Sequence, residues 1–266
     1  MNRRWCLERV IRWWMILFVF ILCFPKAQAA SIDLTEPDAL ENGFTLEVLA
    51  VRQPRTTGRR VYIYHTHTYE AYEMDSENAY KQTEKWRTAD TDYNVVRVGE
   101  ELSARLREAG VEVTHDTTAY EMPKLSTAYS RSLAGIQKAA EKGYDLYIDL
   151  HRDSYSKGNG PNAVLVGGQE TARLLILIGK GSGTSLDEKP DWEANEKVAQ
   201  IISDFLNQRA ENLCRGVSLK SGRYNQQAAT PSILIEVGNN KNTLQEALNA
   251  AEPLARAICQ YFDTLP

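Results

Sequence analysis

Cysteine, histidine and excess basic charge are all scarce in this chain. Its 266 residues include four cysteines and four histidines, and the formal net charge at pH 7 is −4, with a sequence pI of about 5.7. No Cys-x-x-Cys motif or Cys/His pair indicates a structural zinc knuckle. The basic footprint of nucleic-acid-binding proteins is also absent, so we expect no nucleic-acid partner.

Long hydrophobic runs are equally rare, and the single one lies at the N-terminus. Four arginines precede the apolar run from Trp13 to Phe24, and an Ala-Gln-Ala sequence follows at 27–29. Such a pattern is typical of a secretory signal peptide, and the run is shorter than the ~20 residues of a membrane-spanning helix. We predict a signal peptide over 1–29, with a retained membrane anchor as the alternative. The protein is then exported to the extracytoplasmic face of the membrane or the cell wall.

Two cysteines, Cys214 and Cys259, remain outside this leader. In an exported domain they can form a disulfide or stay as two buried free thiols, and the sequence leaves both open. Residues 30–58 begin acidic and end in a Pro/Gly-containing basic stretch, so we interpret them as a linker. The catalytic domain is expected over 59–266.

Strand and helix patterns alternate along this domain. Apolar runs predict strands at 60–64, 111–114, 145–150, 162–166, 173–178 and 232–237. Apolar residues three and four apart predict helices at 95–109, 129–142, 192–209 and 243–262. The last of these opens with a capping-box sequence, Thr243 to Glu246. The alternation predicts an α/β fold: a three-layer sandwich with a largely parallel or mixed central sheet and helices on both faces.

Chemically reactive side chains stand where three predicted strands end. His65 and His67 follow strand 60–64, His151 follows strand 145–150, and Glu236 closes strand 232–237. In open α/β sheets the carboxyl ends of strands collect ligands and catalytic groups. Two imidazoles and a carboxylate suit a catalytic zinc site, in which a carboxylate takes a proton from water. We predict a metal-dependent hydrolase with His67 and His151 as ligands and Glu236 as the base.

Alternative roles exist for the neighbouring residues. His65 could pair with His67 as a His-x-His motif if the strand continued through both, but we favour a strand-end residue hydrogen-bonded to backbone. His115 is expected to be a turn residue. Glu236 could instead form a structural salt bridge with Arg152 or Arg223. The polar stretch 65–93 is unusually long and rich in aromatic residues, and we interpret it as a substrate-contacting lid.

Several segments resemble the stage II sporulation protein P family. His65 to Tyr72 matches the pattern HTHxxExY of that family. Further matches follow in order over about residues 60–260: Arg87–Asp90 with Tyr93–Gly99, Leu150–Ser154, Trp192–Asn195, Arg223–Gln226, and Leu234–Gly238 with Asn242–Ala247. The resemblance implies a peptidoglycan hydrolase of the forespore-engulfment machinery, related to zinc-dependent N-acetylmuramoyl-L-alanine amidases.

The same resemblance implies roles for individual residues. One Zn²⁺ per chain is expected on His67, His151 and a carboxylate, with Glu236 catalytic. The glutamate ligand of the wider amidase group falls near Asp90, where this chain departs from the pattern, and Glu70 is the competitor. We favour Asp90 over Glu70 as the third ligand.

Two arginines and an asparagine complete the predicted site. Either Arg152 or Arg223 could polarise the scissile carbonyl or hold a substrate carboxylate, since a guanidinium suits carboxylates, and a structural role is the alternative for each. We assign Arg152 to catalysis, and Arg223 and Asn225 to substrate binding. The expected partners are peptidoglycan and other engulfment proteins, such as stage II sporulation proteins D and M. Cleavage of peptide cross-links is a further activity of the family that these residues do not separate from amidase activity.

Two other functions compete with the amidase prediction. A metal-free wall glycosidase could use Glu236 with Glu70 or Asp153 as its carboxylate pair, although this leaves the placement of the histidines unexplained. A catalytically silent wall-binding scaffold protein is the second alternative.

Overall fold

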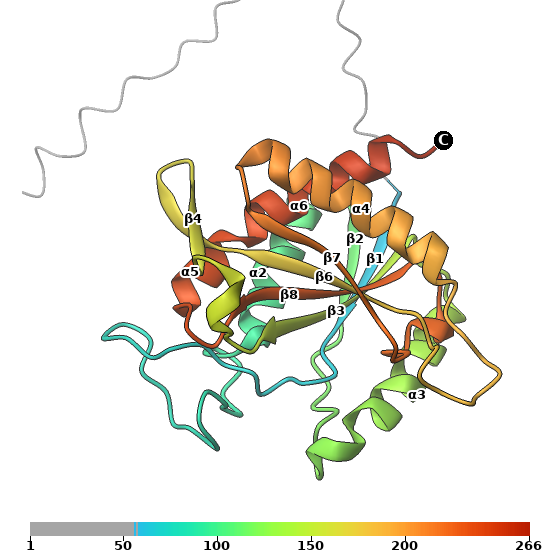
Figure 1. Cartoon of the computed structure of the whole chain (residues 1–266), viewed down its shortest axis with the longest axis horizontal. Coiled ribbons are helices and arrows are strands. Elements are labelled where there is room, and N and C mark those ends of the chain that lie inside the picture. Colours follow the sequence, from blue (N-terminus) through green and yellow to red (C-terminus); the bar gives the residue numbers. More distant parts are fainter. Residues whose placement is uncertain (1–55, 57) are drawn as a thin grey trace, which may run out of the picture. The chain divides into compact units, whose positions relative to one another are not determined.

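Six strands form the central sheet in the computed structural model, which describes Thr56 and residues 58–266 (Figure 1). The predicted leader over 1–29 and nearly all of the predicted linker over 30–58 lie outside the described residues. The strand order is β2-β1-β3-β8-β6-β7. The strands are β1 (Arg60–Tyr64), β2 (Glu112–His115), β3 (Leu146–Asp153), β6 (Leu174–Gly179), β7 (Cys214–Lys220) and β8 (Ser232–Asn239).

The strands of this sheet do not all run in one direction. β2, β1, β3 and β8 are parallel to one another, whereas β6 is antiparallel to β8 and parallel to β7. The carboxyl ends of β1, β3 and β8 therefore meet at one edge, and those of β6 and β7 lie at the opposite edge. The sheet is mixed, as predicted.

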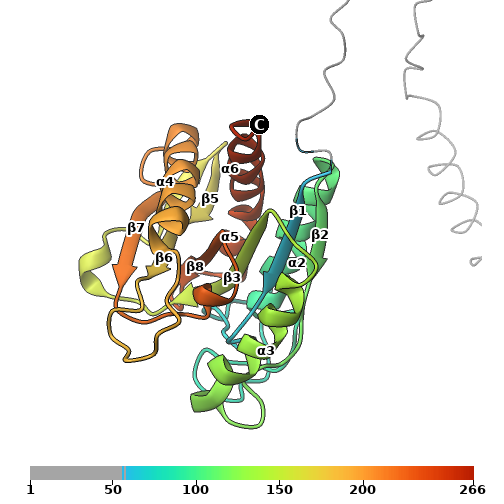
Figure 2. The same cartoon turned by 90° about the vertical axis from the view of Figure 1, so that its right-hand side faces the viewer.

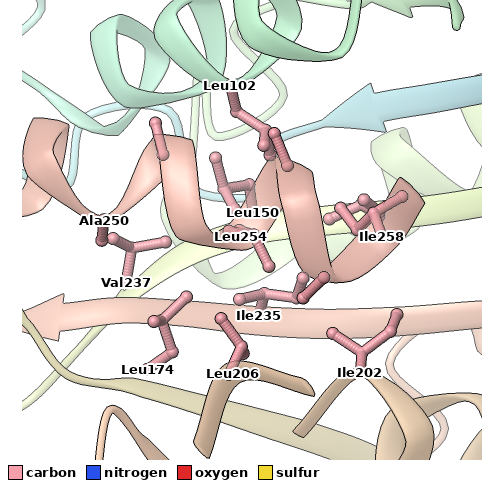
Figure 3. Close-up of a cluster of buried hydrophobic side chains, with 14 of the residues drawn as sticks. Leu102, Leu150, Leu174, Ile202, Leu206, Ile235, Val237, Ala250, Leu254 and Ile258 are labelled. Carbon is pink, nitrogen blue, oxygen red and sulfur yellow. The ribbon is translucent and has the colours of Figure 1, made fainter. Parts of the chain in front are cut away.

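One face of the sheet carries the main hydrophobic core (Figure 3). Three helices cover this face: α2 (Val95–Glu108), α4 (Trp192–Arg209) and α6 (Ala251–Asp263). Leu102, Leu206 and Leu254, one from each helix, pack against strand residues such as Leu150 and Ile235, and all five are at most 1% exposed. Burial of a leucine or isoleucine side chain contributes about 1.5–3 kcal/mol, so this layer supplies much of the stability of the fold.

Within the described residues, one α-helix covers the opposite face of the sheet: α3 (Ala128–Ala140). Its Ile136 and Ala139 pack on Tyr62, Tyr64 and Tyr147 of β1 and β3. In Figure 2, α3 lies well away from α4 and α6. Helices on both faces confirm the predicted three-layer sandwich.

Several local features differ from the prediction. The C-terminal helix is two helices, α5 (Leu244–Asn249) and α6, which join at Ala250, three residues before Pro253. Proline cannot donate a backbone N–H, so a new helix start is a natural place for it. The capping box of Thr243 and Glu246 is present. Three short 3₁₀ helices complete the description: η2 (Leu125–Thr127), η3 (Lys157–Asn159) and η4 (Gln226–Ala228).

Two strands were not predicted. β5 (Gln169–Ala172) pairs with β4 (Ala163–Val166) in a hairpin whose turn residues, Gly167 and Gly168, have φ of 58° and 84°. Two consecutive positive φ angles favour glycine at both positions. The edge strand β7 is the second. It carries a free thiol at Cys214, and Cys259 is free as well. Over the described part of the chain, every helix is too short or too polar to cross a bilayer.

Candidate metal and catalytic site

Two predicted metal ligands and one of the two competing carboxylates meet at the carboxyl edge of β1 and β3. Glu70 lies between the imidazoles: its Oε1 is 3.6 Å from His67 Nδ1, and its Oε2 is 3.4 Å from His151 Nδ1. The two imidazole rings have centroids 5.2 Å apart. Each of the three residues offers a ligand atom within 4.8 Å of the others.

Asp90, which we favoured from the sequence, is not part of this cluster. Its side chain is exposed, and Oδ1 accepts a hydrogen bond from the backbone N–H of Asp92 at 3.1 Å. The geometry therefore supports Glu70 and does not support Asp90.

Glu70 reaches the imidazoles because the segment after β1 folds back on itself. The backbone N–H of Val95 donates to the Glu70 carbonyl at 2.8 Å, and that of Ala71 donates to the Trp86 carbonyl at 2.9 Å. The backbone N–H of Arg152 in turn donates to Glu70 Oε2 at 3.0 Å. Main-chain bonds thus hold the carboxylate in place before any ion binds.

The cluster has strongly shifted acid–base properties. Burial acts to raise the pKa of Glu70, but His151, His67 and Arg152 outweigh it, and that pKa falls well below its usual range. Burial acts to lower the pKa of His151, but Asp149 and Glu70 outweigh it, and that pKa rises well above its usual range. An excess of negative charge around the imidazoles is what a divalent cation requires.

Asp149 contacts His151, and the sequence analysis did not identify it. It is 1% exposed, and its Oδ1 lies 2.8 Å from His151 Nε2. The contact is an ion pair rather than an aligned hydrogen bond, because the ring N–H finds no well-directed acceptor among the described residues. Thr66 donates to the same carboxylate through its backbone N–H at 2.8 Å and through Oγ1 at 2.7 Å. Strand alternation could have revealed it, since Asp149 and His151 stand two apart on β3.

Glu236 lies beside this cluster on the neighbouring strand. Its Cα pairs with that of His151 across β3 and β8. Part of the side chain is accessible, but Oε2 is buried and accepts no hydrogen bond within the described residues. Burial, together with the charges of Glu70 and Asp153, raises the pKa of Glu236 to about 8 against the opposing effect of His151. A carboxyl group with a pKa near neutrality suits general acid–base catalysis.

Arg152 and Arg223 do not contact Glu236 among the ion pairs of the described residues. The guanidinium of Arg152 is buried and donates to the carbonyls of Trp86 at 3.1 Å and Asp153 at 3.2 Å, so these contacts are structural. Arg223 donates to the carbonyl of Glu188 at 3.2 Å. The ring centroid of its neighbour Tyr224 lies 5.9 Å from that of Tyr129, which is 5.5 Å from that of His67. Both guanidinium groups donate to main-chain carbonyls, and the carbonyl-polarising and substrate-binding roles stay predictions.

The side chain of Asn225 likewise makes internal hydrogen bonds and is not an exposed binding group. It is buried and adopts a left-handed backbone conformation with φ of 57°. Its Nδ2 donates to the Tyr129 carbonyl at 2.8 Å and to Ser132 Oγ at 2.9 Å. Ser132 Oγ in turn lies 2.9 Å from Thr66 Oγ1. Asn225 therefore supports the site indirectly. It bonds Ser132, which contacts Thr66, and Thr66 donates to Asp149.

His65 takes the backbone-bonded role expected of it. Burial lowers its pKa to about 3, so the ring is neutral. Nδ1 donates to the Leu150 carbonyl at 2.8 Å, and Nε2 lies 2.8 Å from His115 Nε2. Strand β1 ends at Tyr64, and His65 and His67 do not form a His-x-His pair at the cluster.

The donor set fits zinc. Catalytic zinc sites use three His, Glu or Asp ligands, with zinc–ligand distances of about 2.0–2.2 Å. Tetrahedral ligand atoms are then about 3.3–3.6 Å apart. The contact of His67 Nδ1 with Glu70 Oε1 and that of His151 Nδ1 with Glu70 Oε2 have similar lengths. His67 and Glu70 come from the segment after β1, and His151 comes from β3.

Comparison with known proteins places this chain in a family. The model of stage II sporulation protein P matches residues 26–259. The chain belongs to this family. A relative, "Stage II sporulation protein P" of Bacillus subtilis (strain 168), is 29% identical over 223 residues, which cover 78% of this chain and 53% of that protein. The chain thus spans about half the length of the curated relative that it matches.

Solved amidase structures share the fold of this family member. The CwlD amidase of Clostridioides difficile, solved in complex with the GerS lipoprotein, superposes with a TM-score of 0.51 at 13% identity and covers 77% of this chain and 98% of that chain. The N-acetylmuramoyl-L-alanine amidase AmiC2 of Nostoc punctiforme gives a TM-score of 0.49 at 16% identity, with 78% and 99% covered. The first of these similarities confirms the α/β fold.

Proposed function

We propose that this chain is a zinc-dependent peptidoglycan hydrolase of sporulation that cleaves the amide between N-acetylmuramic acid and L-alanine of the stem peptide. The observation that carries the proposal is the convergence of His67, Glu70 and His151 beside Glu236. Membership of the stage II sporulation protein P family supports the biological setting. The amidase fold supports the reaction class by analogy only.

His67, Glu70 and His151 would hold the ion, and Asp149 would fix the ring of His151. A zinc ion there would polarise the amide carbonyl and lower the pKa of an attacking water. Carboxylates that contact ligand histidines orient the ring and increase its basicity. Asp149 thus acts on the imidazole, and Glu70 is set by the backbone bond from Arg152.

Glu236 moves the proton in this scheme. Its carboxylate takes a proton from water as the new bond to the lactyl carbonyl carbon forms. It then delivers that proton to the alanine nitrogen as the C–N bond breaks. The products are a free lactyl carboxylate on the glycan and a peptide with a free amino terminus. A raised pKa lets Glu236 perform both transfers near neutral pH.

The setting follows from the same proposal. An enzyme of this specificity works on the extracytoplasmic side of the membrane or in the wall, where other engulfment proteins, such as stage II sporulation proteins D and M, are its expected partners. Cleavage of peptide cross-links is a further activity within this proposal.

Mass spectrometry of products from purified sacculi tests the function. We expect peptides with a free N-terminal alanine, loss of activity with a chelator, and recovery with zinc. Glu236→Gln protein is the control for contaminating hydrolases. New reducing sugar ends that are insensitive to chelator would assign the protein as a glycosidase. Wall binding without soluble products would assign it as a scaffold.

A further inference from the structure

A groove of about 640 Å³ begins at Glu236 and extends away from the metal ligands. Residues of β6, β7 and β8 and the segment after β3 line it: Asp153, Ser154, Ser156, Arg173, Leu175, Leu177, Arg215, Val217, Ser218, Lys220 and Glu236. Its volume is within the range of ligand-binding clefts, about 300–1,000 Å³. One end of the groove is therefore the proposed catalytic carboxylate, and the other is the edge strand of the sheet.

Basic side chains outnumber available acids along this groove. Arg173 is 9% exposed, and its guanidinium donates to the carbonyls of Asn212 at 2.7 Å and Pro161 at 3.1 Å, so its charge is fixed in the wall. Arg215 neutralises Asp153 through one Nη2 contact of 2.6 Å. Its Nη1 and Nε have no protein partner in the described region. A guanidinium with open N–H groups can still bind an incoming carboxylate.

Lys220 adds a second available cation at the end of β7. It is exposed, and its ammonium forms no ion pair within residues 58–266. Lys220 and Ser218 alternate on β7 and so share a face of that strand. Arg215 and Lys220 therefore stand near the two ends of one strand, as separate anchor points for two negative charges.

The floor of the groove is apolar and contains no aromatic ring. Leu175 and Leu177 of β6 form it, whereas Val217 of β7 pairs with Ile176 and packs against the main core on the other face of the sheet. An aliphatic surface flanked by cationic side chains suits a peptide in which residues with methyl side chains alternate with residues that have free carboxylates. Neutral sugars have no charge for these cations to recognise, so the lining favours the peptide part of the substrate over the glycan.

We propose that this groove binds an extended peptide with free carboxylates, which lie at Arg215 and Lys220, and with small apolar side chains, which lie on Leu175 and Leu177. The inference rests on the proposed function, because it places the scissile amide at Glu236 and the stem peptide in the groove. It assigns the preference for free carboxylates to two residues outside the catalytic cluster.

Binding of an uncleavable peptide tests the proposal apart from turnover. The probe is the tetrapeptide L-alanyl-γ-D-glutamyl-L-lysyl-D-alanine, compared with the same peptide with both carboxyl groups amidated. It contains no muramoyl amide, so titration calorimetry on the zinc-loaded protein measures binding alone. We expect the free acid to bind about tenfold more tightly than the amidated peptide, since two ion pairs are lost on amidation.

Variants locate the effect. Lys220→Gln should weaken binding of the free acid about threefold to fivefold and leave binding of the amidated peptide unchanged. Arg215→Lys should retain part of the preference, and Arg215→Gln should lose more of it. The matched control is Lys180→Gln, which removes the same charge from a side chain that stacks on Trp192, 4.4 Å from its ring centroid, and does not line the groove.

The outcomes separate the two proposals. Equal affinity of wild-type protein for both peptides, or an equal effect of Lys180→Gln and Lys220→Gln, overturns the groove assignment even if sacculi are hydrolysed. Preference for the free acid that depends on Lys220 supports the groove even if the released products show another bond to be cut. Absence of peptide binding in fully active wild-type protein also overturns it.

Discussion

Asp149 Oδ1 lies 2.8 Å from His151 Nε2, on a ring whose other nitrogen faces Glu70 at 3.4 Å. One nitrogen of His151 is thus engaged by a buried carboxylate, and Nδ1 is left to face the proposed metal position. The two hydrogen bonds from Thr66 fix that carboxylate in turn. Asp149 is therefore a positioning residue for the metal ligand.

The first prediction concerns this positioning. Asp149→Asn should weaken zinc binding about 10–100-fold, because an amide neither carries the charge nor orients the ring as a carboxylate does. Competition with a chromophoric chelator measures the affinity. Asp145→Asn is the control, since Asp145 also precedes His151 on this strand segment but bonds Arg59 and the backbone N–H of Arg60. Unchanged zinc affinity in Asp149→Asn would contradict the assigned role.

The second prediction distinguishes the two candidate carboxylate ligands. Glu70→Gln should reduce the zinc content of purified protein well below one equivalent, because it replaces the only carboxylate between the two imidazoles in the described cluster. Asp90→Asn should retain one equivalent. Metal analysis after dialysis reports both. The reverse result would restore the assignment of Asp90 that the sequence favoured.

The third prediction concerns Glu236 as the proton carrier. Glu236→Gln should lower kcat by about 10²–10⁴-fold, which is the usual contribution of a general acid–base group. Its zinc content should stay at one equivalent, since Glu236 is not in the ligand cluster. Kinetics on a soluble muropeptide and metal analysis of the same sample make the test. Substantial residual activity would remove Glu236 from the mechanism.

The fourth prediction uses the pKa of the same group. A folded-state pKa of about 8, against an ordinary value of 4.5, means that folded protein keeps a proton that the unfolded chain loses between these pH values. The stability of metal-free protein should therefore fall as pH rises through this window. Metal-free Glu236→Gln lacks this loss and should be more stable than wild type at pH 8.5 by at least about 1 kcal/mol. Urea denaturation at pH 5 and 8.5 measures the difference, and parallel pH profiles would argue against the burial described.

The fifth prediction concerns Asn225, which the sequence suggested for substrate binding. Asn225→Ala should cost about 1–3 kcal/mol of stability, because the Tyr129 carbonyl and Ser132 Oγ lose a buried donor. Its KM should change little. Gln200→Ala, which removes an exposed bond to Asp204 on α4, should stay within about 0.5 kcal/mol of wild type. A large rise in KM at unchanged stability would support direct substrate contact instead.

The sequence was informative where one strand determines the position of a side chain. His67, His151 and Glu236 all follow from apolar runs that end at a polar residue, and parallel strands bring such ends together. The helix at 192–209 and the capping box at Thr243 were likewise correct, since local patterns specify both.

The errors occur where tertiary structure decides. Glu70 enters the site because the 29-residue segment 65–93 folds back on itself and is held there by main-chain hydrogen bonds. The local sequence of that segment does not predict how it folds. Strand β7 is polar and lies at an edge, so its alternation was weak. The direction of β6, which is antiparallel to β8, also depends on tertiary structure and could not be predicted from the local sequence.

The reversal of β6 also determines what the groove floor is made of. Leu175 and Leu177 project from β6, which is paired with both β7 and β8, so main-chain hydrogen bonds hold them and no loop needs to move when they are exchanged. Replacing one of them by a larger, smaller or charged side chain alters the width or polarity of the floor at a fixed backbone. A single substitution at Leu175 or Leu177 therefore changes the groove without an insertion and without disturbing His67, Glu70 or His151.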